Sequence, residues 1–239
     1  MFKKNEFSIY ILSIIISIIK RNFAAIINLL MRLHRNLCFA VIDGLLLIFN
    51  EGEYADKVIQ KLLKRDKRWG SRDRGFVAET TYDIVRWKRL YAEIAQIKEP
   101  FSRDDAWRLF AVWATLKGIK LPDWKYFEGT PTRKIKGRFD ILSKDRKFRE
   151  SIPDWIDELG VKELGETKWT KELAMQNKQA NVILRVNTLK TSKSDLKLKL
   201  ESENIETIEI EGYPYALQLK ERANVFTTEA FKDGWFEVQ

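Results

Sequence analysis

The chain has 239 residues, a formal net charge of +9 and a pI near 9.4. Such an excess of positive charge favours a polyanionic partner, either nucleic acid or an anionic membrane surface. Its single cysteine, Cys38, and single histidine, His34, exclude a disulfide framework and a Cys/His zinc cluster built within the chain. We therefore expect no metal site, and a protein of the reducing cytoplasm.

The first 32 residues form a hydrophobic extension. Its apolar run, Phe7 to Ile19, is 13 residues long, with Lys3-Lys4 before it and Lys20-Arg21 after it. A helix of that length spans about 20 Å, short of the roughly 30 Å hydrocarbon core, and no small-x-small cleavage site follows. This segment is rich in Ile, Lys, Asn and Phe, the residues that AT-rich codons specify. We therefore favour the interpretation that translation begins at Met31 and that the extension is spurious. An interfacial helix and a membrane anchor over residues 7–30 remain open, and only such a segment would bring stable membrane association.

Residues 33–150 have the pattern of an all-helical bundle. Apolar residues recur at helical spacing from Leu37 to Ile48, and further helices are predicted over 54–65, from Ser71 as N-cap to Val85, and after Ser102. Prolines and glycines between 121 and 138 indicate a loop or insertion rather than a packed element. Cys38 lies in an apolar helical stretch and is predicted to be buried and inert.

Residues 151–239 have the pattern of a small α+β module. Short helices are predicted over 152–159 and 170–176, and a longer one over 192–203. Strands are predicted over 181–187, 205–211, 216–220 and from 235. Charge changes at the same boundary: residues 35–150 carry a net +9 and residues 151–239 a net −4. Phosphate contacts are therefore expected mainly from the helical half.

Several motifs together resemble the RsmB/NOP family of RNA 5-methylcytosine methyltransferases. Two lie in the helical half: Arg68 to Val77 (RWGSRDRGFV) and Tyr82 to Trp87 (YDIVRW). The more specific ones follow it: SIPDW from Ser151, LRVNT from Leu184 and FKDGWFEVQ from Phe231 to Gln239. The resemblance covers roughly residues 33–239. It implies a NusB-like all-helical bundle followed by a small α+β, half RRM-like module.

The resemblance also implies an activity that needs more than this chain. In the family a Rossmann-type methyltransferase domain follows the Gln that matches Gln239, binds S-adenosylmethionine through a glycine-rich loop and supplies two cysteines. None of these parts is recognisable here, and Cys38 is in the wrong domain. We therefore expect the RNA-binding portion of a ribosomal RNA cytosine-C5 methyltransferase, monomeric, binding no cofactor and inactive alone. The alternative is a standalone NusB-like RNA-binding or antitermination module without enzymatic activity.

The candidate RNA-binding residues fall into three groups, with no catalytic residue among them. The first surrounds the helix that begins near Ser71, the second is the basic tract in the predicted loop, and the third is a pair on one face of the 181–187 strand. For each basic group, the competing interpretation is a solvated surface or ion pairing within the domain. For Asn187, the competing interpretation is that it opens the turn before the next helix. The three groups are Arg68, Arg72, Arg74, Arg86, Lys88 and Arg89; Arg133, Lys134, Lys136 and the neighbouring Arg138; and Arg185 with Asn187.

Overall fold

The computed structural model describes residues 32–239, and the chain divides into two compact units on either side of the Leu173–Ala174 bond. The hydrophobic extension predicted over residues 1–32 lies, except for Arg32, outside the described residues. Within 32–239 no helix is long and apolar enough to span a bilayer, and no cluster of three or more His, Cys, Asp or Glu residues could hold a metal ion. The predicted boundary at residue 150 stays a prediction.

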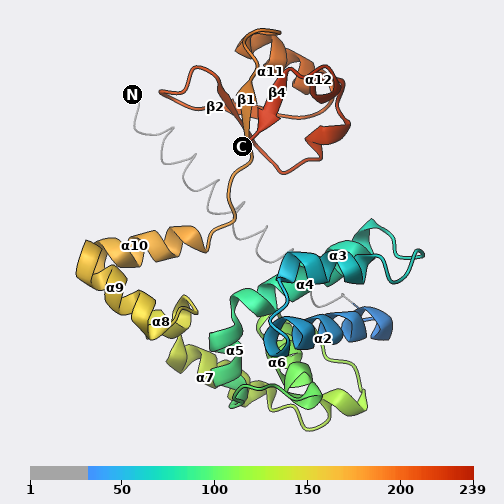
Figure 1. Cartoon of the computed structure of the whole chain (residues 1–239), viewed down its shortest axis with the longest axis vertical. Coiled ribbons are helices and arrows are strands. Elements are labelled where there is room, and N and C mark those ends of the chain that lie inside the picture. The colour runs from blue at the N-terminus through green and yellow to red at the C-terminus, as the bar shows by residue number, and fades with distance from the viewer. Residues whose placement is uncertain (1–31) are drawn as a thin grey trace, which may run out of the picture. The chain divides into compact units, whose positions relative to one another are not determined.

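The first unit is a bundle of helices (Figure 1). Helix α2 packs against α3, α4 and α6, and α5 packs against α6 and α7. A 3-10 turn, η1, covers part of α6, and three further helices, α8 to α10, lead out of the bundle. The elements are α2 (Arg35–Asn50), α3 (Ala55–Leu63), α4 (Ser71–Arg86), α5 (Lys88–Ala95), α6 (Arg103–Leu116), η1 (Lys125–Phe127), α7 (Thr132–Leu142), α8 (Arg146–Arg149), α9 (Asp154–Leu164) and α10 (Glu166–Gln176).

The core of the bundle follows the apolar periodicity of the sequence. In α2 the predicted stripe is buried at Leu37, Val41 and Leu45, and Cys38 lies among them with no exposed surface. Helix α6 begins as predicted, because the Ser102 side chain accepts a hydrogen bond from the Asp105 backbone N–H at 3.1 Å. The predicted all-helical bundle is therefore confirmed.

The segment 121–138 is the largest departure from the predicted elements. It was expected to be a loop, but it contains η1 and the first half of α7. Phe127 and Ile135 are both buried in the bundle core, Phe127 with its ring 5.4 Å from that of Trp107. The loop prediction was wrong because two buried apolar residues outweigh the breakers around them, and Gly137 is tolerated on an exposed helix face.

Helices α8, α9 and α10 form a small satellite of the bundle with its own apolar cluster. Trp169 lies flat against Gly160, and its indole N–H donates to Asp157 at 2.9 Å. The same carboxylate accepts two hydrogen bonds from Arg146, at 2.8 and 3.0 Å. Trp155, near the start of α9, is 65% exposed and is not part of this cluster.

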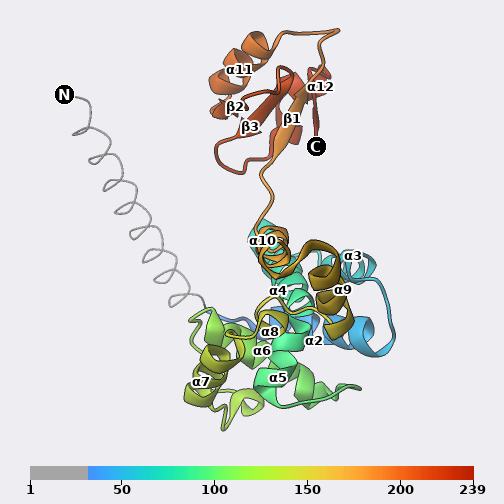
Figure 2. The ribbon, with the colours of Figure 1, turned by 90° about the vertical axis from the view of Figure 1, so that its left-hand side faces the viewer.

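The second unit is a four-stranded antiparallel sheet with helices against one face (Figure 2). Alternation sets its faces: Leu184 and Val186 are buried, whereas Arg185 between them is exposed. Leu196 and Leu200 of α11 bury against the same side as Leu184. The elements are β1 (Ile183–Val186), α11 (Lys193–Ser202), β2 (Thr207–Glu209), β3 (Ala216–Leu219), η2 (Val225–Thr227), α12 (Glu229–Lys232) and β4 (Phe236–Val238).

The strand order is β2-β3-β1-β4, and every neighbouring pair is antiparallel. All four predicted strands and the predicted 192–203 helix are present, so the α+β module is confirmed. The chain order is β-α-β-β-α-β, with the second helix reduced to the four residues of α12. One face of this sheet is therefore covered by helices, and the other is left open.

Candidate nucleic-acid interface

The open face of the sheet holds Arg185 near its centre. Arg185 is exposed and lies opposite Ala216 of β3 and Glu237 of β4. Because Arg185 forms no ion pair within residues 32–239, its guanidinium is free to bind a phosphate or a base edge. The strand alternation placed this side chain on the correct face.

Amide side chains lie next to Arg185 on the same face. The Asn181 side-chain N–H donates to the Gln218 side-chain oxygen at 3.2 Å, which leaves the second Asn181 N–H, both Gln218 N–H groups and the Asn181 oxygen for a ligand. Ile183 and Ile208 lie in register with Gln218 and give the face an apolar strip. Such a face can hydrogen-bond the edges of unstacked bases, although the outward positions of β1 to β4 hold no aromatic ring for stacking.

Asn187 has a structural partner on each side of its amide. It donates to the Gly234 carbonyl at 2.9 Å and accepts from the Leu189 backbone N–H at 3.2 Å. These bonds hold the turn after β1 against the segment that leads into β4. The turn-opening interpretation of Asn187 therefore has direct geometric support, whereas its RNA contact stays a prediction.

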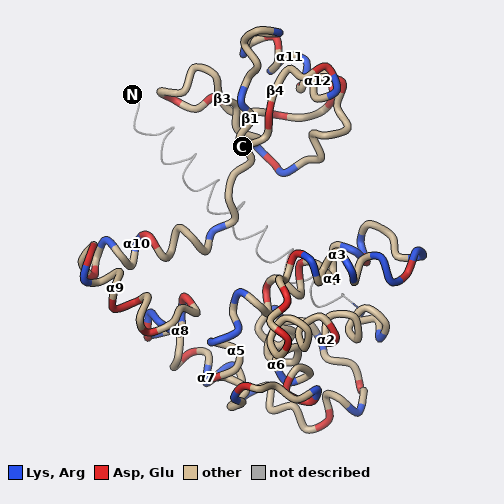
Figure 3. The backbone as a smooth tube through the Cα atoms, in the orientation of Figure 1, with Lys and Arg blue, Asp and Glu red and all other residues tan. Residues whose placement is uncertain are grey.

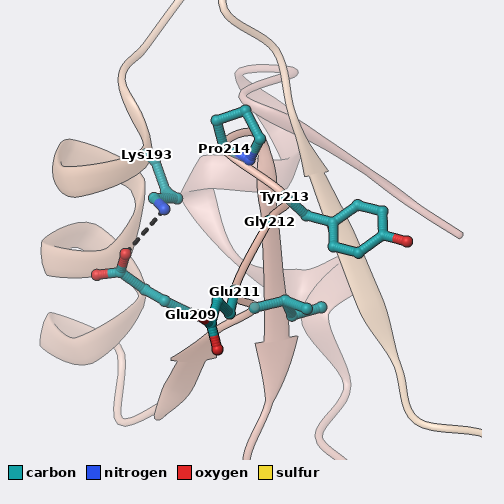
Figure 4. A pocket seen from close by; sticks show the side chains of 7 residues that line it. Lys193, Glu209, Glu211, Gly212, Tyr213 and Pro214 are labelled. Atoms are coloured by element: carbon teal, nitrogen blue, oxygen red, sulfur yellow. Dashed lines mark ion pairs between the residues drawn. The ribbon is translucent and has the colours of Figure 1, made fainter.

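A shallow hollow lies at the turn between β2 and β3 (Figure 4). Lys193 and Glu209 on one side of it form an ion pair at 2.8 Å, and this hydrogen bond lowers the pKa of the Glu209 carboxyl. Tyr213 points away from that pair and is 65% exposed, and Tyr215 is 60% exposed. Since the lysine is neutralised, the feature of interest is the pair of tyrosine rings, which suit base stacking.

In the helical unit, Arg74 is used to hold the fold together. Its guanidinium donates to the Leu63 carbonyl at 2.7 Å and to the Trp69 carbonyl at 3.0 Å. These two carbonyls lie at the two ends of the turn between α3 and α4. Arg74 therefore stabilises this turn as a half-buried side chain, with two of its five N–H donors bound to backbone carbonyls.

Three other predicted cations in this group have partners on other segments of the helical unit. Arg86 donates to the Glu150 carbonyl at 3.2 Å, and Arg89 donates to the Ile152 carbonyl and pairs with Asp154 at 2.8 Å. Lys88 pairs with Glu99 at 2.8 Å. The pairing interpretation thus has support for these residues.

The remaining predicted cations are exposed. Within residues 32–239, Arg68 has only the neighbouring Asp66 as a partner, and its hydrogen bonds lower the pKa of that carboxyl to about 2. Arg72 is exposed at the start of α4. On α7, three cations lie exposed on the surface, whereas Arg138 donates to the Ile94 carbonyl at 2.7 Å and to Gln96. The exposed three are Arg133, Lys134 and Lys136.

Comparison with known families finds a match that covers helices α9 and α10 and most of the second unit. Residues 152–226 match the family model described as the ferredoxin-like domain of Methyltr_RsmF/B-like proteins. The matched residues contain β1, β2 and β3 of the sheet. This segment is similar to the RsmF/B-like ferredoxin-like domain. The match includes α9 and α10 of the first unit and ends before α12 and β4 of the second.

Two similar proteins extend the comparison, the first by sequence and the second by fold alone. A 90-residue stretch, 37% of this chain, is 32% identical to the Probable ribosomal RNA small subunit methyltransferase B of Synechocystis sp. and spans 20% of that protein. The crystal structure of PH0851 superposes with a TM-score of 0.55 at 20% identity, over 87% of this chain and 54% of that one. The chain thus corresponds to a minor part of the first protein and about half of the second. The predicted resemblance to the N-terminal region of RsmB/F methyltransferases is confirmed.

The structure adds residues that the sequence analysis missed. Tyr213 and Tyr215 of the RsmF/B-like ferredoxin-like domain follow Gly212, whose φ of +79° allows the turn that exposes them. Lys64 and Lys67 lie exposed at the turn between α3 and α4. A Gly-Tyr-Pro-Tyr turn and the density of lysine before Trp69 were the available signals for these four residues.

Proposed function

We propose that this chain is the RNA-binding portion of an S-adenosylmethionine-dependent ribosomal RNA cytosine-C5 methyltransferase. The observation that carries the proposal is the RsmF/B-like ferredoxin-like domain at residues 152–226, with the exposed, unpaired Arg185 on its open sheet face. RNA-binding sheets commonly use such a face for single-stranded segments. The relative from Synechocystis sp., named a probable ribosomal RNA small subunit methyltransferase, supports ribosomal RNA as the substrate.

The described residues do not fit S-adenosylmethionine. Neither β1 nor β3 runs through a glycine-containing turn into a helix, which is the cradle that nucleotide-type cofactors need. Nor does Cys38 fit the nucleophile that must attack C6 of the cytosine, because burial raises the pKa of its thiol to about 12. We therefore assign this chain no chemical step and expect a catalytic domain to supply cofactor and thiolate.

The role left to this chain is to orient the RNA. Arg185 would bind a phosphate or base edge, the Asn181–Gln218 amide pair would read a base edge, and the rings of Tyr213 and Tyr215 would stack on unpaired bases. Among the predicted contacts, Arg68, Arg72, Arg133, Lys134 and Lys136 have the exposure that phosphate binding requires.

Bisulfite sequencing of ribosomal RNA tests the proposed function. Cells in which the gene is disrupted within the codons for residues 32–239 should lose protection at a specific cytosine, and the intact gene should restore it. A complementing gene with Arg185→Ala should restore it only partly, whereas Lys162→Ala, an exposed position on α9, should restore it fully. Unchanged protection in the disrupted strain would instead favour a standalone RNA-binding module.

A further inference from the structure

The turn between α3 and α4 carries a large local excess of positive charge, matched in the described helical unit by residues 133–149. Between Lys57 and Arg74 there are eight Lys and Arg residues but only two acids, Asp66 and Asp73. Figure 3 shows these cations gathered along α3 and the turn that follows it. A net charge of +6 within 18 residues accounts for much of the chain's +9.

Not all of these cations are available to a ligand. Lys61 pairs with Glu53 at 2.6 Å and Arg65 with Asp43 at 2.6 Å. Arg74 donates hydrogen bonds to two backbone carbonyls. Three residues of the turn remain exposed and form no ion pair with the described acids: Lys64, Lys67 and Arg72. Arg68, 88% exposed, adds a fourth cation whose only partner is Asp66.

The turn that carries these cations is held in one conformation. The Trp69 side chain is buried in the bundle core, and its backbone N–H donates to the Asp66 carbonyl. The two hydrogen bonds from Arg74 fasten the Leu63 and Trp69 carbonyls at either end. A fixed backbone lowers the entropy lost on binding, so cations displayed on it bind phosphates better than those on a mobile tail.

The surface also selects the kind of partner. From residue 55 to residue 75 every exposed residue is charged, polar or glycine, since the apolar side chains and Trp69 face the core. The turn itself has no exposed aromatic ring for base stacking, since the exposed Tyr54 lies at the other end of α3, and no exposed apolar side chain for insertion into a lipid layer. The exposed cations are therefore the feature that a partner would contact, and their positive charge suits a phosphate backbone.

We propose that Lys64, Lys67, Arg68 and Arg72 form a phosphate-binding surface that grips the backbone of duplex RNA without reading its sequence. The inference rests on the proposed RNA-binding function and adds a second contact, distinct in residues and in mode from the open sheet face. Base-paired segments of a folded RNA present phosphates in a regular A-form array, which is what a rigid cationic turn can engage.

The test is the salt dependence of binding by the full chain to an RNA duplex of about 20 base pairs. Each phosphate contact contributes about 0.7 to 0.9 to the slope of log affinity against log salt. The triple variant Lys64→Ala, Lys67→Ala, Arg72→Ala should therefore lower the slope by about 2 to 3 and weaken binding at least tenfold near physiological salt. Duplexes of different sequence should respond alike.

The chain offers a matched control with the same loss of three charges. Lys162, Lys168 and Lys171 are exposed on α9 and α10, where five acids between residues 157 and 172 outnumber them. Changing all three to alanine should leave the slope within about 0.5 of the parent. A charge-keeping variant, Lys64→Arg, Lys67→Arg, Arg72→Lys, should retain the parent slope and exclude misfolding as the cause.

Three outcomes would overturn the inference. One is a triple variant whose slope equals that of the parent or of the control; if the parent still binds the duplex, the proposed function survives and only this surface fails. Another is the absence of any duplex binding by the parent at low salt, which also removes support for the function. The third is a triple variant that binds RNA as well as the parent but no longer binds vesicles in which about a quarter of the lipid is phosphatidylserine. That result would assign the turn to a membrane surface.

Discussion

Replacing Gly160 by alanine should loosen the satellite helices α8 to α10. A Cβ at this position would lie 2.2, 2.3 and 2.6 Å from three ring atoms of Trp169. The indole must therefore shift, and the shift breaks its 2.9 Å hydrogen bond to Asp157, a carboxylate that is only 10% exposed. A helix position that normally favours alanine over glycine should here favour glycine.

The magnitude follows from three opposing terms. Overpacking costs about 1 to 3 kcal/mol. Loss of a hydrogen bond to a charged group costs about 1.5 to 3 kcal/mol. Alanine returns about 1 kcal/mol of helix propensity. We expect the free energy of opening of α9 and α10 to fall by about 2 to 4 kcal/mol, because these terms overlap where one ring movement causes both losses.

Amide hydrogen exchange followed by mass spectrometry measures this opening directly. Peptides within residues 154–176 should exchange about 30-fold to several hundred-fold faster in Gly160→Ala than in the parent. Gly137→Ala is the matched control, since Gly137 lies on an exposed face of α7 with nothing within 4 Å of a new Cβ. That variant should be more stable by about 0.5 to 1 kcal/mol. Equal protection of Gly160→Ala and the parent would refute the packing argument.

Three further predictions concern ionisable groups. The Arg146 hydrogen bonds lower the pKa of Asp157, so the pair stabilises the fold at pH values above the pKa of an unfolded carboxyl. This stabilisation is lost as pH falls below about 4, and Asp157→Asn should flatten that part of an acid-unfolding curve. Arg74→Ala leaves two backbone carbonyls without a donor and should cost about 1 to 3 kcal/mol in denaturant unfolding, whereas Arg72→Ala should stay within about 0.5 kcal/mol. Cys38, buried and with its pKa raised to about 12, should react with a thiol reagent only in denaturant, and rapid labelling of the native chain would contradict its burial.

The sequence was most informative where one physical rule dominates. The short, β-branched run over residues 181–187 identified β1, and the alternation of side chains along a strand gave the outward position of Arg185. The helical spacing of apolar residues after Ser102 identified α6, and the Ser102 cap explains where this helix begins. These signals are local, and the backbone obeys them regardless of distant contacts.

The sequence failed where tertiary contacts decide the outcome. Arg72 and Arg74 are two residues apart in the same basic motif. Arg72 is exposed, whereas Arg74 donates to two carbonyls of the preceding turn. Nothing in the residue types separates them. Likewise, Trp155 and Trp169 flank the same helix region, but only Trp169 finds a glycine surface to cover.

The count of charged residues also identified the basic half of the chain, but it did not show where exposed cations form a surface. The excess over residues 35–150 is real, but partners inside the fold occupy Arg86, Lys88 and Arg89. The exposed remainder falls mainly on the α3–α4 turn and on α7. Which cation is paired depends on helices that meet only after folding, and a linear count cannot show this.

The central claim is that this chain positions ribosomal RNA for methylation at a cytosine. Ultraviolet cross-linking of the protein in its own cells, followed by sequencing of the bound RNA, tests it most directly. The account predicts cross-links that cluster on small-subunit ribosomal RNA around a bisulfite-protected cytosine and that weaken with Arg185→Ala. Cross-links spread evenly over unrelated RNAs, or none above background, would contradict it.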